Sequence, residues 1–140
     1  MIRIATLAAA ALLGLTAIPA HAEGDTLTLT YETGVRTGKV MIAVFNSEVA
    51  YNGGEPIVSV EADASGETAV AVLRDLPAGE YAVRAFHDVN GDGRMNTNPF
   101  GMPSEPYAFS NNAVGMMGPA SWERAHFTVS GDTAQTISIR

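Results

Sequence analysis

The stretch TLTLTY at residues 26–31 alternates strictly between polar and apolar side chains. A period of two places all the apolar side chains on one face of an extended chain, which is the pattern of a strand with one buried face. The same spacing recurs near the end of the chain, at Phe127 and Val129 and again at Ile137 and Ile139. The sequence therefore predicts an all-β fold built from short strands.

Four more strands are predicted between these stretches. The run Val40–Phe45 is apolar throughout, so we expect a central strand covered on both faces. Turn signals rich in glycine, proline and asparagine separate it from the others. About seven strands of this length favour a β-sandwich, and a closed barrel is the main alternative. The three further strands are expected at Ile57–Val60, Thr68–Leu73 and Tyr81–His87.

Composition limits the function classes before any motif is considered. The 140 residues suit one domain, and 46% hydrophobic against 16% charged residues is typical of a globular chain rather than a disordered one. The absence of cysteine excludes disulfides, thiolate metal sites and a cysteine nucleophile. The net charge of -7 argues against nucleic acid and anionic membrane surfaces as partners, because both select basic patches.

Residues 1–22 have the pattern of a secretory signal peptide. Arg3 is followed by an uncharged apolar run over residues 4–18 and by the small-residue pattern AHA, which ends at Ala22. The run is shorter than the roughly 20 apolar residues of a membrane span. We therefore expect Sec-type export with cleavage after Ala22. The expected product is a single periplasmic or secreted domain at residues 23–140, without membrane insertion.

A stretch of 36 residues from Asp88 to Glu123 separates the fifth predicted strand from the sixth. Its first part, DVNGDG at residues 88–93, matches the pattern D-x-N-x-D-G of calcium-binding loops. Alternate residues of such a loop direct oxygen atoms inward, and calcium takes six to eight oxygen ligands. We therefore predict a weak calcium site. Its ligands would be Asp88, Asn90, Asp92, the carbonyl oxygen of Arg94, Asn96 and Glu105.

The loop departs from the EF-hand pattern. Pro99 stands at position twelve, where EF-hand loops have a bidentate glutamate, and Glu105 is included because it is the next acid after Asp92. The same sequence is also a good turn, because Asn, Asp and Gly accept left-handed backbone angles and bond to their own backbone. A loop that is ordered without metal is therefore the alternative. His87 is expected to anchor the loop by a hydrogen bond.

Two segments carry a family resemblance: LPAGEYAVRAFHDVNGDGRMNTNPFGMPSEPYAFSNNA from Leu76, and GPASW, which ends at Trp122. They are similar to the DUF2141 family of small exported bacterial proteins, which has no established biochemical function. The resemblance covers nearly all of residues 23–140. It implies a sandwich of immunoglobulin-like or transthyretin-like type, with the long loop as its distinctive feature. The family usually has Phe in place of Met117, so the loop methionines are interpreted as hydrophobic substitutes.

Four aromatic residues of the long stretch suggest a binding role. They would form a surface for a carbohydrate or a peptide, or else pack the loop onto the sandwich. These residues are Phe100, Tyr107, Phe109 and Trp122.

Two chemical alternatives involve the same region. A small hydrolase centred on His87 would take Ser110 or Ser121 as its nucleophile, although the chain has no G-x-S-x-G turn. Thioether sulfurs in an exported protein also suit copper, but the methionines are irregularly spaced and commonly fill gaps in packing. The prediction is therefore a non-catalytic, calcium-stabilised binding or structural module with an unidentified partner. The copper hypothesis concerns Met95, Met102, Met116 and Met117 with His87 and His126.

Overall fold

The alternating stretch at residues 26–31 lies in strand β1 (Asp25–Thr33). Its three apolar side chains, Leu27, Leu29 and Tyr31, are fully buried, so the predicted half-buried strand is confirmed. The computed structural model describes residues 24–140, and the expected signal peptide lies outside these residues. None of the helices in the described chain is long and apolar enough to cross a bilayer.

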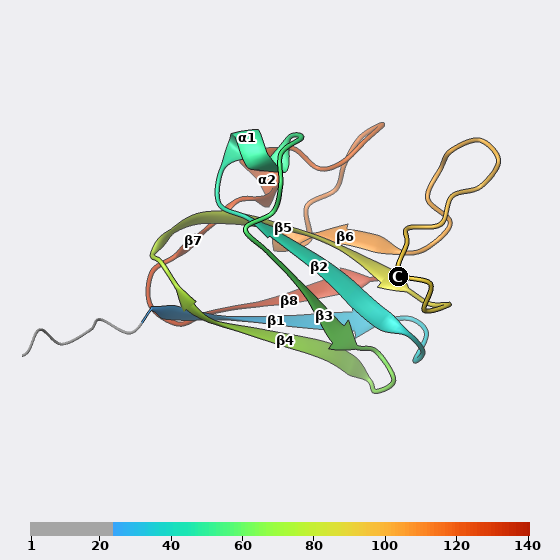
Figure 1. Cartoon of the computed structure of the whole chain (residues 1–140), viewed down its shortest axis with the longest axis horizontal. Helices are drawn as coiled ribbons and strands as arrows, with labels where there is room; N and C mark the ends of the chain where they lie inside the picture. Colours follow the sequence, from blue (N-terminus) through green and yellow to red (C-terminus); the bar gives the residue numbers. More distant parts are fainter. Residues whose placement is uncertain (1–23) are drawn as a thin grey trace, which may run out of the picture.

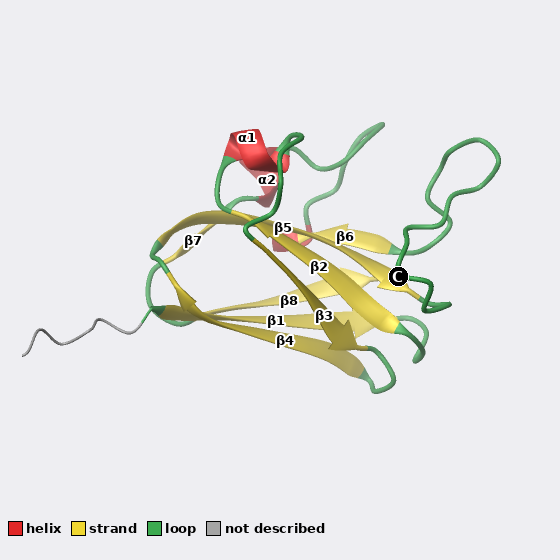
Figure 2. Cartoon of the chain, in the orientation of Figure 1, coloured by secondary structure: helices red, strands yellow, loops and turns green. Residues whose placement is uncertain are grey.

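Residues 24–140 form eight strands in two sheets that face each other, as Figure 1 and Figure 2 show. The first sheet has the order β4-β1-β8, in which β4 (Thr68–Leu76) is antiparallel to β1 and β8 (Thr133–Ile139) is parallel to it. The second sheet has the order β3-β2-β5-β6, and β7 pairs with the first residues of β5. Its strands are β3 (Val58–Asp63), β2 (Lys39–Phe45), β5 (Gly79–Asp88), β6 (Tyr107–Phe109) and β7 (Phe127–Val129).

The predicted all-β, sandwich-like fold is confirmed, with eight described strands where about seven were expected. The extra strand is β6, which lies inside the stretch predicted as one long loop. Three residues are too few to show an alternating pattern, and β6 exists because it pairs with β5, Phe86 opposite Tyr107 and Arg84 opposite Phe109. The same stretch also contains a short 3-10 helix, η1 (Ser110–Asn112), and a helix, α2 (Trp122–Ala125), begins at its end.

Strand β2 differs from its prediction on one face. Val40, Ile42 and Val44 point into the sandwich and are buried, whereas on the other face Phe45 is buried and Met41 and Ala43 are only partly buried. The expectation of a strand covered on both faces therefore holds only at Phe45, because loops rather than another layer of strands border the rest of the outer face. The apolar run in the sequence does not distinguish these two situations.

Two apolar clusters hold the structure together. The larger lies between the sheets and includes the inward side chains of all three strands of the first sheet. The smaller gathers where α1 (Glu48–Tyr51) and α2 meet the second sheet, around Tyr51. The Tyr51 hydroxyl donates to the Ala120 carbonyl oxygen at 2.7 Å, and its ring packs edge-on against those of Phe45 and Trp122. The long stretch therefore packs onto the second sheet and α1 through this smaller cluster.

Candidate functional site

The end of β5 is tied to the turn between β1 and β2, which fixes where the long loop begins. His87 is fully buried, and its Nε2 lies 2.6 Å from the carbonyl oxygen of Thr37. A carbonyl oxygen only accepts, so Nε2 carries the proton. The N–H of His87 donates to the Pro106 carbonyl oxygen at 2.8 Å. His87 thus bonds to the preceding turn and to the returning end of the loop, and not to its neighbour Asp88.

Asp88 closes the first turn of the loop with its carboxylate. The residue is 2% exposed, and its two oxygens accept the N–H groups of Gly91 at 3.1 Å and Gly93 at 2.8 Å. Both glycines have positive φ angles, +74° and +78°, which glycine adopts without a steric penalty. The DVNGDG pattern therefore shapes a tight turn around one buried carboxylate.

Asp92 lies at the exposed side of the same turn. Its oxygens accept from the Arg94 N–H at 2.9 Å and from Asn96 Nδ2 at 2.8 Å. These donors, the Asn96 amide above all, hold the pKa of Asp92 below its usual value, so the carboxylate is charged at neutral pH. Arg94 enters this network through its N–H group, whereas its carbonyl oxygen was the predicted ligand atom.

Glu105 lies far along the chain but returns to the start of the loop, because β6 runs antiparallel to β5. It is 8% exposed, and its oxygens accept from the N–H groups of Val89 and Asn96, both at 3.2 Å. One oxygen each from Asp88, Asp92 and Glu105 lie within 4.8 Å of one another. Like charges at this separation repel, and a cation bound among them would relieve the repulsion.

The asparagine side chains supply hydrogen bonds that can hold the loop without a metal ion. Asn90 Nδ2 donates to Asn96 Oδ1 at 3.2 Å, and Asn90 Oδ1 accepts the N–H of Asp92 at 3.2 Å. The loop is thus held by its own hydrogen bonds, as the alternative interpretation requires. For Asn96 to bind a cation beside Asp92, its amide must rotate by half a turn so that oxygen replaces nitrogen. The structure brings the three predicted carboxylates together and leaves the asparagines as donors at their edge.

The four predicted aromatic residues divide into two pairs. Phe100 is 90% exposed and Tyr107 is 49% exposed. Phe109 is buried and belongs to the second core, and Trp122 packs against that core while its ring stacks on His126 with centroids 5.4 Å apart. Only Phe100 and Tyr107 therefore present a large part of their rings to solvent.

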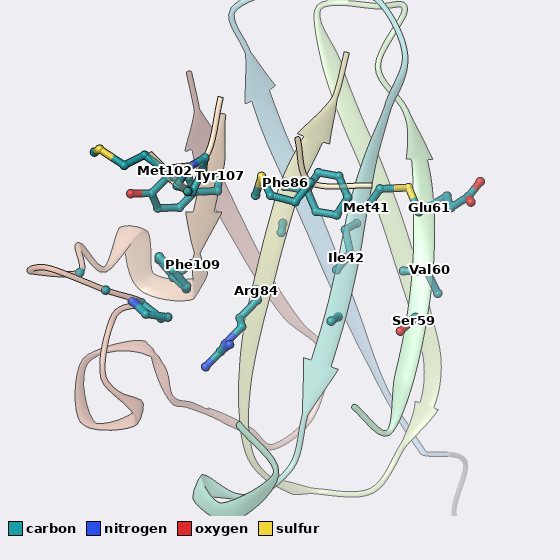
Figure 3. Close-up of a pocket in the computed structure, with 18 of the residues that line it drawn as sticks. Met41, Ile42, Ser59, Val60, Glu61, Arg84, Phe86, Met102, Tyr107 and Phe109 are labelled. Atoms are coloured by element: carbon teal, nitrogen blue, oxygen red, sulfur yellow. The ribbon is translucent and has the colours of Figure 1, made fainter. Parts of the chain in front are cut away.

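A groove on the outer face of the second sheet was not foreseen from the sequence. It encloses about 1010 Å³ and lies over β3, β2, β5 and β6, between the loop residues 95–103 and 115–119 (Figure 3). Four methionines line it, but His87 and His126 of the copper hypothesis do not. One of the four is Met41, which the copper hypothesis did not include, and Met116, which it did include, does not line the groove. The groove depends on the register of four strands, for which the sequence carries no local signal.

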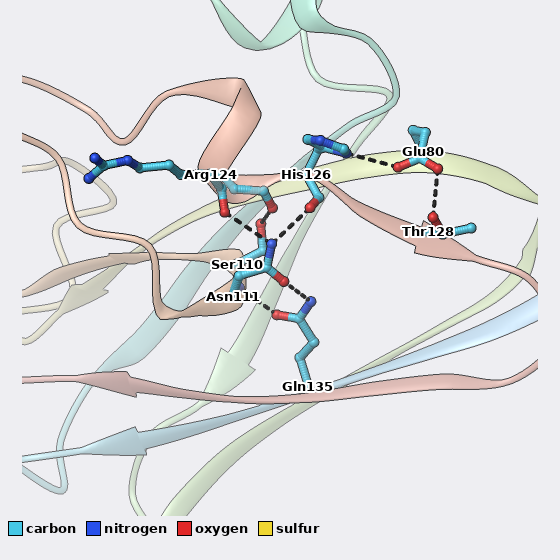
Figure 4. A network of polar contacts seen from close by, with 8 residues as sticks. Glu80, Ser110, Asn111, Arg124, His126, Thr128 and Gln135 are labelled. Atoms are coloured by element: carbon cyan, nitrogen blue, oxygen red, sulfur yellow. Dashed lines mark hydrogen bonds and ion pairs between the residues drawn. The ribbon is translucent and has the colours of Figure 1, made fainter.

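A polar network fastens the end of the long stretch to the sandwich (Figure 4). Asn111 donates from Nδ2 to the carbonyl oxygens of Arg124 and His126, and it exchanges two hydrogen bonds with the side chain of Gln135 in β8. Asn112 accepts the N–H of Ser138 at 2.9 Å and donates to the Thr136 carbonyl oxygen. The side chain of Asn112 thereby pairs with the outer edge of β8.

Ser110 is the buried member of this network. Its Oγ accepts the N–H of Val83 at 2.9 Å and donates to the Ala125 carbonyl oxygen. The Ser110 hydroxyl and the His87 ring are not hydrogen-bonded to each other, since Ser110 Oγ bonds to Val83 and Ala125 and His87 Nε2 bonds to Thr37.

Ser110→Ala should lower the free energy of unfolding by about 2 kcal/mol, because it leaves two buried backbone groups without partners. Urea unfolding measures the change. Ser59→Ala, at an exposed position of β3, is the control and should change stability by less than about 0.5 kcal/mol. Equal effects of the two variants would show that Ser110 does not fasten the segment.

A comparison with known protein families places this fold and loop in one group. The family described as "Uncharacterized protein conserved in bacteria (DUF2141)" matches residues 32–138. The chain belongs to the DUF2141 family. The match to the DUF2141 family covers residues of both sheets, the acidic loop and the Asn111 network. A search of curated proteins gives no match to the chain.

Proposed function

We propose that this DUF2141 protein is an exported, non-catalytic binding or structural module whose loop is stabilised by calcium. The observation that carries the calcium assignment is the meeting of Asp88, Asp92 and Glu105, with oxygens within 4.8 Å. Two of them come from one tight turn and the third from a distant segment. A cation bound there would join the two ends of the loop. A self-contained turn would not need the distant Glu105 carboxylate beside it.

The sequence at residues 1–22 supports export. An exported protein is consistent with a calcium site of low affinity. Extracellular modules bind calcium with dissociation constants of about 0.1–1 mM, far weaker than cytosolic buffers do. A site with three carboxylates and few preorganised neutral oxygens suits that range. The burial of His87 and its bond to Thr37 support the non-catalytic part of the proposal.

Calcium titration of residues 23–140 tests the proposal. With a dissociation constant near 1 mM, 10 mM calcium should raise the free energy of unfolding by about 1.4 kcal/mol. Asp92→Asn should abolish most of this increase, and Glu105→Gln should do the same from the other end of the loop. Thermal unfolding with and without calcium, together with calorimetry, measures both effects.

The control is Asp75→Asn, which makes the same charge change at an exposed position outside the loop. It should keep the full calcium effect. Equal melting temperatures of the unmodified protein with and without calcium would overturn the assignment, as would equal calcium effects in Asp92→Asn and Asp75→Asn.

A carbohydrate- or peptide-binding module is the second candidate, favoured by the exposure of the Phe100 ring. A glycan and peptide array probed with the unmodified protein and with Phe100→Ala tests it. Binding that Phe100→Ala leaves unchanged would count against a role of this aromatic residue.

A further inference from the structure

We propose that the groove on the outer face of the second sheet binds an elongated apolar carboxylate of the fatty-acid type. Arg84 would receive the carboxylate, and the apolar floor and methionine walls would cover the chain. This site is separate from the acidic loop, and its occupation does not depend on calcium.

The strand register builds the floor of the groove as two parallel rows. Met41 lies opposite Phe86 on one side and Glu61 on the other, and Phe86 lies opposite Tyr107. This row therefore crosses all four strands and is apolar except at its Glu61 end. Strands lie about 4.8 Å apart, so the row spans about 14 Å.

The second row lies two residues away from the first along each strand. It consists of Ser59, Ala43, Arg84 and Phe109, again as direct neighbours. Ser59 and Ala43 are small, so space remains above this part of the sheet beside Arg84. The floor thus combines an apolar strip with an open position next to a single cation.

The walls are two loop segments on either side of β6. Residues 95–103 contribute Met95, Met102 and Pro103, and residues 115–119 contribute Met117 and Pro119. Methionine side chains are unbranched and flexible, and they adapt to apolar ligands of variable shape. The volume of about 1010 Å³ is at the upper end of the usual range for small-molecule sites, about 300–1,000 Å³.

Arg84 gives the groove its preference for an anion. Its guanidinium lies over the Tyr51 ring at 4.3 Å, and Nη2 donates to the Tyr51 carbonyl oxygen at 2.6 Å. Its Nε is buried and has no hydrogen-bond partner, and no carboxylate among residues 24–140 forms an ion pair with Arg84. The cation is therefore held in place but is not neutralised by the protein.

The other charge in the groove does not compete for the same role. Glu61 is paired with Lys39, with Nζ 2.6 Å from Oε2, and Figure 3 shows it pointing away from Arg84. An apolar molecule with one carboxylate therefore matches the distribution of charge. A cationic or neutral molecule of the same length would leave Arg84 unpaired.

Binding of dodecanoate to residues 23–140 tests the inference, at concentrations below micelle formation and in EDTA so that calcium plays no part. Methionine methyl NMR is the readout, because Met41, Met95, Met102 and Met117 line the groove whereas Met116 does not. We expect the four lining methyls to shift on titration. Dodecan-1-ol and dodecyltrimethylammonium should bind at least about tenfold more weakly, since neither forms a charge-assisted bond with Arg84.

Three variants separate the parts of the site. Arg84→Met should bring the affinity for dodecanoate down to that for dodecan-1-ol, and Arg84→Lys should restore part of the difference. Met41→Asp puts an anion on the floor and should abolish dodecanoate binding. Its matched control is Val72→Asp on the outward face of β4, where Val72 is 47% exposed, and this variant should bind normally.

Several outcomes would overturn the inference. One is equal affinity of the unmodified protein for dodecanoate and dodecan-1-ol, and another is a preference that survives in Arg84→Met. A third is dimerisation, measured by analytical ultracentrifugation, that Met41→Asp prevents and Val72→Asp does not, since the occupant of the groove would then be a second copy of the chain. A failed calcium titration would leave all these results interpretable, because they are obtained without calcium.

Discussion

Replacing Gly38 with alanine is expected to lower the free energy of unfolding by about 3 kcal/mol. Gly38 has a φ of +69°, and this left-handed backbone costs other L-residues roughly 1–2 kcal/mol. A Cβ at this position would also overlap the carbonyl oxygen of Asp88, which is backbone and cannot rotate away. Either the turn or the start of the acidic loop must move. Urea unfolding measures the loss.

Gly131→Ala isolates the conformational part of this effect. Gly131 has a φ of +79°, but a Cβ there would meet no atom within 4 Å. Its replacement should cost only about 1 kcal/mol. If the two variants lost equal stability, the close approach of Gly38 to Asp88 would have no energetic role, and the turn would not position the loop.

Asp88→Ala is expected to lower the free energy of unfolding by about 3 kcal/mol even in EDTA. The variant removes the acceptor for two N–H groups, those of Gly91 and Gly93, from a side chain that is 2% exposed. Each hydrogen bond to a charged acceptor contributes roughly 1.5–3 kcal/mol. Relief of repulsion with Asp92 and with Glu105 offsets this by about 1 kcal/mol for each pair, if the pairs are screened nearly as in water.

Amide hydrogen exchange shows where the stability is lost. The N–H groups of Gly91 and Gly93 should exchange much faster in Asp88→Ala. The exchange rates of the β1 N–H groups should rise only as far as the loss in the global free energy of unfolding requires. Asp132→Ala is the control, because this exposed carboxylate accepts one N–H, that of Thr26, at 3.2 Å. It should cost less than about 1 kcal/mol. An Asp88→Ala loss as small as that would mean that the carboxylate does not order the loop.

The strands that alternate were predictable because their pattern records burial on one face, as at residues 26–31. Strand β6 was not, because its three residues are ordered by pairing with Arg84 and Phe86, which are distant in sequence. Local patterns carry no signal of such pairing. The apolar run Val40–Phe45 does not reveal what covers the outer face of β2, because a bordering loop and a second layer of strands both favour apolar side chains.

The carboxylates of the acidic cluster were predictable from the sequence, but their hydrogen-bond partners were not. Glu105 was included as a possible ligand because it is the next acid after Asp92, and the structure places it beside Asp88 through the antiparallel return of β6. The side chains that Asn90 and Asn96 bond to could not be inferred, because they depend on the fold of the turn. The groove around Arg84 was beyond prediction, since it requires the register of four strands.

The parallel pairing of β1 with β8 has a consequence for how the chain folds. Leu27 lies opposite Thr133 and Thr33 opposite Ile139, so the first described strand finds one of its two neighbours only in the last. Contacts between such distant residues slow folding, because loop closure must precede them. The first sheet therefore cannot be completed until β8 has been synthesised. A chain of this kind stays unfolded for longer, which is the state that the proposed export through a Sec-type translocon would require.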